Sequence, residues 1–203
     1  MEVLVIRHGQ SVADIENRCE GNADFALTDL GIQQAQSAAR WIAAHCPPQM
    51  IFSSPLRRAA QTAEILGNTL NISINYDDSL CEMNIGIWAG LKKEEAFQKF
   101  PFPSGGFKPH ERVPGGESGI EVRARAEQAW SRLISTCAEC PRIAVISHGT
   151  LIMMLFRAFL NLPMDSEVGM RTDDTGIHLW KAAGRSRQIG FLNRCDHLLA
   201  GKE

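Results

Sequence analysis

Two apolar runs in the chain are each followed by histidine and glycine. Arg7, His8 and a glycine follow the first run, near the N-terminus, and a serine, His148 and Gly149 follow the second. Such runs are typical of buried strands, and in open α/β sheets ligands bind beyond the carboxyl ends of the strands. One histidine at a strand end is most often a hydrogen-bonded loop residue, but the repeated dipeptide favours a functional site shared by both strand ends.

A third apolar run, residues 50–52, leads into a Ser-Ser-Pro segment and the consecutive arginines Arg57 and Arg58. These arginines either lie on a solvated helix face or join the two histidines at one edge of the sheet. In the second case the positive charges repel one another unless an anion lies among them. A phosphate dianion fits, because arginine presents paired N–H donors to its oxygens and a helix N-terminus adds backbone donors. The sequence therefore predicts a phosphate site.

The elements that must position these residues alternate between strands and helices. Strands are expected where short apolar runs are bounded by polar residues, and helices where apolar residues recur at helical spacing. The expected strands are residues 2–6, 50–52, 72–76, 142–146, 176–180 and 188–192. The expected helices are residues 28–46, 54–70 (with Ser54 as N-cap and Pro55 first), 118–137 and 149–160. This alternation predicts an α/β fold with three layers, α/β/α, around a mainly parallel central sheet.

The segment between residues 101 and 119 is rich in proline and glycine. Nine of its nineteen residues are of these two types, which predicts a loop. Phe100, Phe102 and Phe107 lie in or beside it, where they would cap a pocket or pack on a partner chain. We expect residues 92–117 to form a lid-like insertion in a single domain covering residues 1–203.

Length and composition limit the class of protein. A chain of 203 residues with 44% hydrophobic and 22% charged residues is an ordinary globular domain. Its 21 Lys+Arg against 23 Asp+Glu give a net charge of −2, which argues against nucleic-acid binding. The longest apolar stretch, residues 151–156, is too short to cross a membrane, and the N-terminal run is too short for a signal peptide. We therefore expect a cytoplasmic protein that binds neither nucleic acid nor membrane.

The six cysteines are spread along the chain without the pattern of a secreted disulfide scaffold, and we expect reduced thiols. Cys137 and Cys140 form a C-x-x-C pair. A zinc site needs two more ligands at suitable spacing, and no second C-x-x-C or His pair supplies them. Packing at a helix end is the better interpretation, and no metal is predicted.

Residues 4–11, Leu-Val-Ile-Arg-His-Gly-Gln-Ser, resemble the opening of the histidine phosphatase superfamily, which contains cofactor-dependent phosphoglycerate mutase. Further segments resemble the family in order and type. They are Gly21 with Asp24 and Leu27-Thr28, Gly31 with Gln33-Gln34-Ala35, residues 53–63, Glu82 with Gly86, Trp88 and Gly90, Gly116-Glu117-Ser118, and Ser147-His148-Gly149. The resemblance covers essentially the whole chain and implies a phosphoglycerate mutase-like fold.

By this resemblance His8 is the nucleophile that becomes phosphohistidine, and Glu82 is the proton donor to the leaving alcohol. Arg7, Arg58 and His148 hold the phosphoryl group; the family has its arginine directly before alanine, which selects the second of the two consecutive arginines. The roles are physically consistent, because neighbouring guanidiniums disfavour a protonated imidazole and stabilise charge on the phosphoryl oxygens. The arginines neutralise that charge, so neither a metal nor another cofactor is expected.

Two positions depart from the family pattern. Many members carry asparagine six residues after the nucleophilic histidine, where this chain has Asp14, and Glu20 replaces a residue that is often polar and uncharged. An ionised carboxylate cannot donate to phosphate and repels it. We assign Asp14 and Gly149 to the phosphate site and predict that Asp14 lowers affinity for simple phosphate esters. The alternatives are that the two acids recognise a cationic part of the substrate or point to solvent.

The fate of the phosphohistidine separates two activities. A mutase must exclude water and hold two phosphate groups, which in the family takes a longer insertion with paired arginines, and the segment after Glu82 is short and has no such pair. We therefore expect a metal-independent phosphomonoesterase that acts on a small phosphorylated metabolite. The alternatives are a cofactor-dependent phosphoglycerate mutase and a non-catalytic phosphate-binding relative. Whether the chain forms a homodimer stays open.

Overall fold

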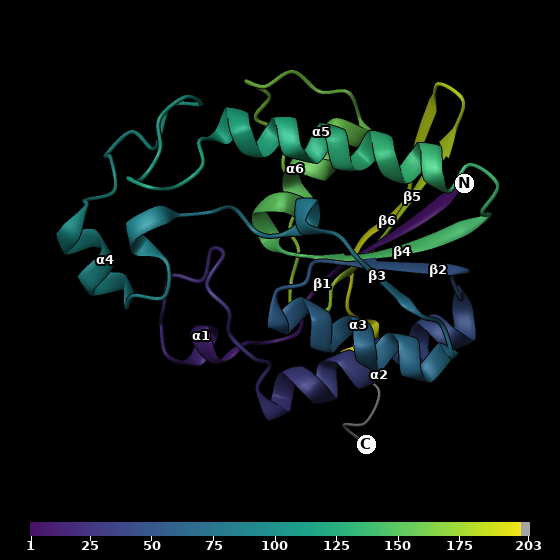
Figure 1. The fold of residues 1–203 in the computed structure, drawn as a ribbon. Coiled ribbons are helices and arrows are strands. Elements are labelled where there is room, and N and C mark those ends of the chain that lie inside the picture. Colours follow the sequence, from purple (N-terminus) through teal and green to yellow (C-terminus); the bar gives the residue numbers. More distant parts are fainter. Residues whose placement is uncertain (200–203) are drawn as a thin grey trace.

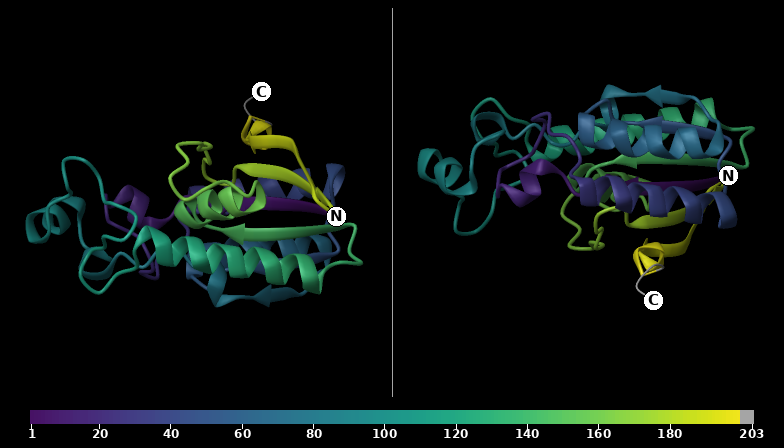
Figure 2. Two further views of the ribbon diagram at one scale, coloured as in Figure 1. Left: turned by 90° about the horizontal axis from the view of Figure 1, so that it is seen from above. Right: turned by 90° about the horizontal axis from the view of Figure 1, so that it is seen from below.

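The computed structural model describes residues 1–199, which form a six-stranded sheet between two layers of helices (Figures 1 and 2). The strands, in chain order, are β1 Glu2–Arg7, β2 Met50–Ser53, β3 Ile74–Tyr76, β4 Arg142–Ser147, β5 Ile177–Ala183 and β6 Ser186–Arg194. Their order across the sheet is β3-β2-β4-β1-β5-β6. The first four are mutually parallel, and β5 and β6 join by antiparallel pairing. The predicted three-layer fold with a mainly parallel sheet is confirmed.

Both faces of the central strands are covered, which is why these strands are continuously apolar rather than alternating. Val3 and Val5 of β1 pack under α5 (Gly119–Thr136) and α6 (Gly149–Phe159), whereas Leu4 and Ile6 face α2 (Asp29–His45) and α3 (Arg57–Leu70). Figure 1 shows the two helix pairs on opposite sides of the sheet. The result is two separate apolar cores that hold the strand ends in register.

Three of the four expected helix starts hold, including that of α6 at Gly149, and one is wrong. Thr28 caps α2 by accepting from the Gly31 N–H at 3.0 Å, and Ser118 caps α5. Ser54, however, is not the N-cap of α3, which begins at Arg57 with no side-chain cap. The Ser54 hydroxyl lies 2.8 Å from a ring nitrogen of His148 instead. The same hydroxyl accepts from the Leu56 N–H at 3.2 Å, so Ser54 links the segment before α3 to a distant histidine and caps no residue inside the helix.

Residues 92–117 project beyond the end of the sheet that lies opposite the N-terminus (Figures 1 and 2). They contain the short helix α4 (Lys93–Lys99), which the sequence analysis did not predict, followed by an irregular loop. Trp88 anchors this segment: its indole N–H donates to the Phe100 carbonyl at 3.0 Å. Its ring centroid lies 5.3–6.2 Å from those of four phenylalanines, Phe97, Phe100, Phe102 and Phe107. These aromatic rings give the segment its own small core.

The remaining short elements are α1 (Val12–Ile15) and the 3₁₀ turns η1 (Asp78–Leu80), η2 (Gly86–Trp88) and η3 (Asp196–Leu198). All six cysteines are free thiols, and Cys137 is fully buried in the core at the end of α5. Within residues 1–199, no group of three or more His, Cys, Asp or Glu side chains is arranged to hold a metal. None of the helices described is both long and apolar enough to cross a membrane.

Candidate active site

The two histidines that follow β1 and β4 lie side by side. The strands are parallel neighbours, with Arg7 opposite Ser147 at their ends, so the residue after each strand emerges at the same point. The ring centroids of His8 and His148 are 5.0 Å apart, and both side chains are buried. Because β2 flanks β4 on its other side, the segment after β2 reaches the same place. The sheet order therefore brings all three strand ends together.

His8 is held as a neutral imidazole with one ring nitrogen directed into the site. Its Nδ1 lies 2.8 Å from the Gly9 carbonyl oxygen, which can only accept, so the hydrogen belongs on Nδ1. Nε2 then keeps its lone pair and accepts from the Nε–H of Arg58 at 3.2 Å. Burial, followed by the positive charges of Arg58 and Arg7, holds the pKa of His8 well below its usual value. Such a ring is nucleophilic at Nε2.

Arg58, and not Arg57, enters the site. Its side chain is fully buried, and its two terminal nitrogens donate to the carbonyls of Ala23 at 2.8 Å and Gly21 at 2.7 Å. Arg57 is exposed and contributes only its backbone N–H, to Asp24 at 2.7 Å. The guanidinium group of Arg58 is therefore held in one orientation beside His8.

Arg7 is positioned by a loop that the sequence analysis did not single out. It donates to the Thr172 carbonyl at 3.0 Å and lies 3.6 Å from the Asp174 carboxylate. Thr175, which donates its N–H to the His8 carbonyl at 3.2 Å, adopts a left-handed conformation with φ of 53°. These residues lie more than 160 positions after Arg7 along the chain, and no local motif indicated the contact.

His148 is held by Ser54 through one ring nitrogen and presents its second ring nitrogen to the site. Its Nε2 is 2.8 Å from the Ser54 hydroxyl, whereas its buried Nδ1 has no hydrogen-bond partner among the described residues. If the Ser54 hydroxyl donates, Nδ1 carries the ring hydrogen. Burial, and then the charge of Arg58, holds the pKa of His148 well below its usual value. With its hydrogen on Nδ1, the ring is a neutral hydrogen-bond donor available to an anion.

Glu82 lies at the N-terminus of α6, which begins at Gly149. Its carboxylate accepts from the backbone N–H groups of Thr150 at 2.9 Å, Leu151 at 3.2 Å and Met83 at 2.8 Å. A helix N-terminus is a favourable place for a carboxylate. Three backbone donors therefore orient this group beside the histidine pair.

The two acidic residues that depart from the family pattern occupy different places. Asp14 is exposed and belongs to the capping box of α1, where its carboxylate accepts from the Ser11 N–H at 2.8 Å. Glu20 points inward: its carboxylate oxygens lie 3.9 Å from His8 Nε2 and 3.5 Å from Arg58 Nε, and it accepts from the Ser11 hydroxyl. The alternative that both acids point to solvent is therefore wrong for Glu20.

A cavity of about 310 Å³ opens beside this cluster. Acidic side chains of Asp14, Glu20 and Glu82 line it together with the aromatic rings of Trp88 and Phe102. The projecting segment therefore forms one wall of the cavity that Glu20 and Glu82 line, whereas His8 and His148 do not line it.

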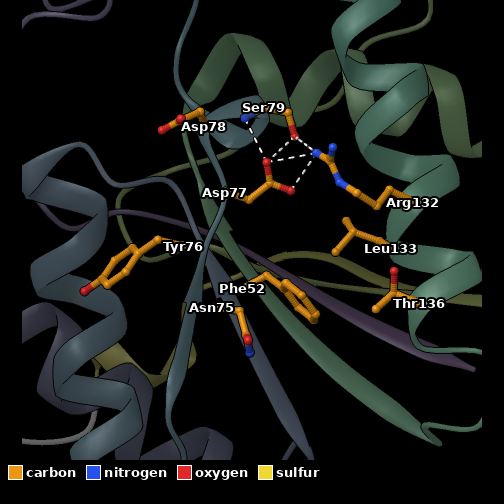
Figure 3. Close-up of a pocket in the computed structure, with 9 residues that line it drawn as sticks. All are labelled: Phe52, Asn75, Tyr76, Asp77, Asp78, Ser79, Arg132, Leu133 and Thr136. Atoms are coloured by element: carbon orange, nitrogen blue, oxygen red, sulfur yellow. Dashed lines mark hydrogen bonds and ion pairs between the residues drawn. The ribbon is translucent and has the colours of Figure 1, made fainter.

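A larger cavity of about 550 Å³ lies elsewhere, between η1 and α5 (Figure 3). Arg132 donates there to both carboxylate oxygens of Asp77, at 2.9 and 2.7 Å. Since this pair is satisfied internally and none of the predicted site residues lines the cavity, the smaller cavity is the candidate active site.

Comparisons of this chain with known proteins agree on one family. The family model described as histidine phosphatase superfamily (branch 1) matches residues 3–194. A glucosyl-3-phosphoglycerate phosphatase of Mycolicibacterium vanbaalenii is 33% identical over 172 residues, covering 81% of this chain and 76% of that protein. A probable phosphoglycerate mutase of Proteus mirabilis is 29% identical over 186 residues, covering 87% and 83%. The solved structure of a mycobacterial glucosyl-3-phosphoglycerate phosphatase with VO3 has a TM-score of 0.82 at 27% identity, covering 95% of this chain and 98% of that one.

Proposed function

The chain belongs to the histidine phosphatase superfamily, branch 1, and on that premise we propose that it hydrolyses its substrate through a phosphohistidine formed on His8. It is a phosphoric monoester hydrolase for a small phosphorylated metabolite, in line with its phosphatase relatives. The observation that carries the proposal is the state of His8: a buried neutral ring with its hydrogen on Nδ1 and its lone pair on Nε2 beside Arg58. That arrangement is what attack on phosphorus requires.

In the first step, His8 Nε2 attacks phosphorus and the bond from phosphorus to the ester oxygen breaks. The leaving oxygen takes a proton from the Glu82 carboxyl group. Negative charge spreads over the three equatorial oxygens in the transition state. Arg7, Arg58 and the Nδ1–H of His148 are already oriented to stabilise it.

In the second step, the Glu82 carboxylate removes a proton from water as the water oxygen attacks phosphorus. The bond between Nε2 and phosphorus breaks, and its electron pair returns to His8. Inorganic phosphate leaves, and Glu82 again carries the proton it gave up in the first step. One side chain therefore serves as acid and then as base, which contributes about 10²–10⁴-fold to the rate.

We place Asp14 and the first residue of α6, Gly149, at the border of the phosphate site. Residues 92–117 are proposed to act as a lid over the leaving group, because Phe102 lines the cavity from that side. The substrate class is a small phosphate ester, and the relative that is 33% identical carries the name of a phosphatase for one such compound. Hydrolysis is favoured over mutase chemistry, since the segment after Glu82 contains no arginine pair.

The reaction is proposed to need no metal, because two guanidiniums supply the positive charge that phosphoryl transfer requires. A cytoplasmic location stays a prediction; the free thiols are compatible with a reducing compartment. The absence of nucleic-acid binding and the formation of a homodimer also stay predictions.

The test is hydrolysis of p-nitrophenyl phosphate in the presence of excess chelator. Wild-type protein is expected to be active, the His8→Ala variant inactive, and His45→Ala, an exposed histidine on α2, fully active. Loss of wild-type activity with chelator would contradict the metal-free mechanism. Inactive wild-type protein would instead support the non-catalytic alternative. A screen of phosphate release from a panel of metabolites then identifies the ester.

A further inference from the structure

The carboxyl group of Glu20 borders the position where the proposed phosphoryl group must bind. One of its oxygens is 3.9 Å from His8 Nε2 and the other is 3.5 Å from Arg58 Nε. A phosphorus atom ready for attack lies about 3–3.5 Å from the attacking nitrogen, and its oxygens extend beyond that. A phosphoryl group on His8 therefore touches the Glu20 carboxyl group.

Glu20 is also held in this place. The Ser11 hydroxyl donates to its carboxylate, and Ser11 is itself completely buried. The backbone N–H of Ser11 is fixed in turn by Asp14, at 2.8 Å. Only 16% of the Glu20 side chain is exposed. The Glu20 carboxyl group is therefore held inside the site and is not a surface group.

The groups around Glu20 do not supply enough positive charge to balance both an ionised Glu20 and a bound phosphoryl dianion. The groups that face it or lie next to its partners are Arg7 and His8 at the end of β1, Asp14 of α1, Arg58 of α3, His148, Glu82 and Asp174. The two histidines are neutral, and Arg7 shares its charge with Asp174. A phosphoryl dianion in contact with an ionised Glu20 would meet strong repulsion at this distance.

We infer that Glu20 is a phosphate-binding residue in its protonated form, whose carboxyl O–H donates a hydrogen bond to a phosphoryl oxygen, so that the dianion binds together with one proton. The inference rests on the proposed phosphoryl site. Protonation removes the negative charge of Glu20, so that the side chain binds phosphate in its present position instead of repelling it. Burial supports it independently, because it raises the pKa of Glu20 above its usual value even though Arg58 and Ser11 oppose the shift.

This proton linkage has a measurable sign. Where inorganic phosphate is already the dianion and Glu20 is otherwise ionised, binding takes up one proton. The Kd for phosphate therefore rises about tenfold per pH unit. A glutamine at position 20 donates through its amide at every pH. The Glu20→Gln variant is expected to take up one proton fewer than wild type on binding phosphate, so that its Kd rises less steeply with pH.

The experiment is titration calorimetry with inorganic phosphate between about pH 8 and pH 9, in pairs of buffers with different ionisation enthalpies, which reports the protons taken up. Wild type is expected to take up about one proton more than Glu20→Gln, because any proton bound by Glu82 is common to both proteins. Asp14→Asn is the matched control, since it removes a different acidic group at the cavity while the proton uptake stays as in wild type. Glu20→Ala is expected to bind phosphate more weakly than Glu20→Gln, because it lacks a donor.

Equal proton uptake by wild type and Glu20→Gln would overturn the inference, because the proton would then be bound elsewhere, for example on His148. Lack of uptake by wild type, or lack of phosphate binding by both proteins, would overturn it as well. The measurement involves no turnover. A failed phosphohistidine mechanism would appear as activity that survives His8→Ala, which is a separate result.

Discussion

The Nε–H of Arg58 donates to Nε2 of His8 across 3.2 Å, while the opposite ring nitrogen of His8 lies 2.8 Å from the Gly9 carbonyl. The two contacts hold the imidazole at both ends and fix which nitrogen carries hydrogen. The guanidinium that orders the nucleophile is also next to the position of the proposed phosphoryl group. When Nε2 forms its bond to phosphorus, the Arg58 N–H loses its acceptor and becomes available to a phosphoryl oxygen.

This relationship predicts the isomer of the phosphohistidine. Only Nε2 has a lone pair directed into the site, so the phosphoryl group is expected on Nε2 and not on Nδ1. Turnover quenched without acid, followed by ³¹P NMR or detection with isomer-specific antibodies, distinguishes the two. An Nδ1-linked product would contradict the hydrogen-bond assignment of His8.

Ser54→Ala is expected to lower kcat by about 10- to 100-fold, with a smaller effect on KM. The variant leaves the buried Nε2 of His148 without its partner, at a cost of about 1–3 kcal/mol, and a tenfold rate change corresponds to about 1.4 kcal/mol. Ser53→Ala is the control, because it removes a buried hydroxyl that bonds only the Ser54 carbonyl, at 2.9 Å. If both variants lose stability and activity to the same extent, Ser54 has no specific effect on His148.

Asp14→Asn is expected to lower KM for simple phosphate esters about fivefold, which corresponds to about 1 kcal/mol, the repulsion between unit charges 4 Å apart in water. The asparagine oxygen can still accept from the Ser11 N–H, so the start of α1 and the melting temperature are expected to stay unchanged. Steady-state kinetics over a panel of esters checks the result. An unchanged KM would mean that the Asp14 charge does not reach the phosphate.

The protein is expected to lose stability as the pH falls from about 6.5 to 4. Burial lowers the pKa of His178 to about 4, and the neutral ring accepts from the Asn193 N–H at 3.1 Å. Between the two pKa values the unfolded chain binds a proton that the folded chain does not, so stability falls with falling pH, by about 3 kcal/mol for this residue. His8 and His148 act in the same direction.

Denaturant unfolding at two pH values measures this loss. His178→Gln is expected to show a smaller loss of stability between about pH 7 and pH 5 than wild type, since glutamine does not titrate. An equal loss in both proteins would assign the acid sensitivity to other groups.

Much of the architecture could be predicted from the sequence, because strands buried on both faces are continuously apolar and the repeated His-Gly dipeptide indicates where two of them end. Local patterns also identified the caps of α2 and α5. The short helices α1 and α4 were missed because neither has enough residues to show an apolar period.

The failures at the site have a different physical cause. Ser54 has good capping chemistry, but its hydroxyl contacts a buried histidine that follows a distant strand, and its local bond is to the N–H of Leu56, before α3 begins. Asp174 reaches Arg7 through a turn that only the pairing of β5 with β1 creates. The inward direction of Glu20 depends on its contacts with Ser11 and Arg58. Each of these contacts joins residues that are not close neighbours in the chain, so no local sequence pattern indicates it.

The order of the strands also has a consequence for synthesis on the ribosome. Strand β4 inserts between β1 and β2, which are both translated long before it. Until about residue 150 has left the exit tunnel, a nascent chain holds one imidazole and two guanidiniums with no second histidine beside them and with no strand between β1 and β2. The proposed phosphate site is therefore expected to form late in translation, and to be complete only after the partners of Arg7, Thr172 and Asp174, have also emerged.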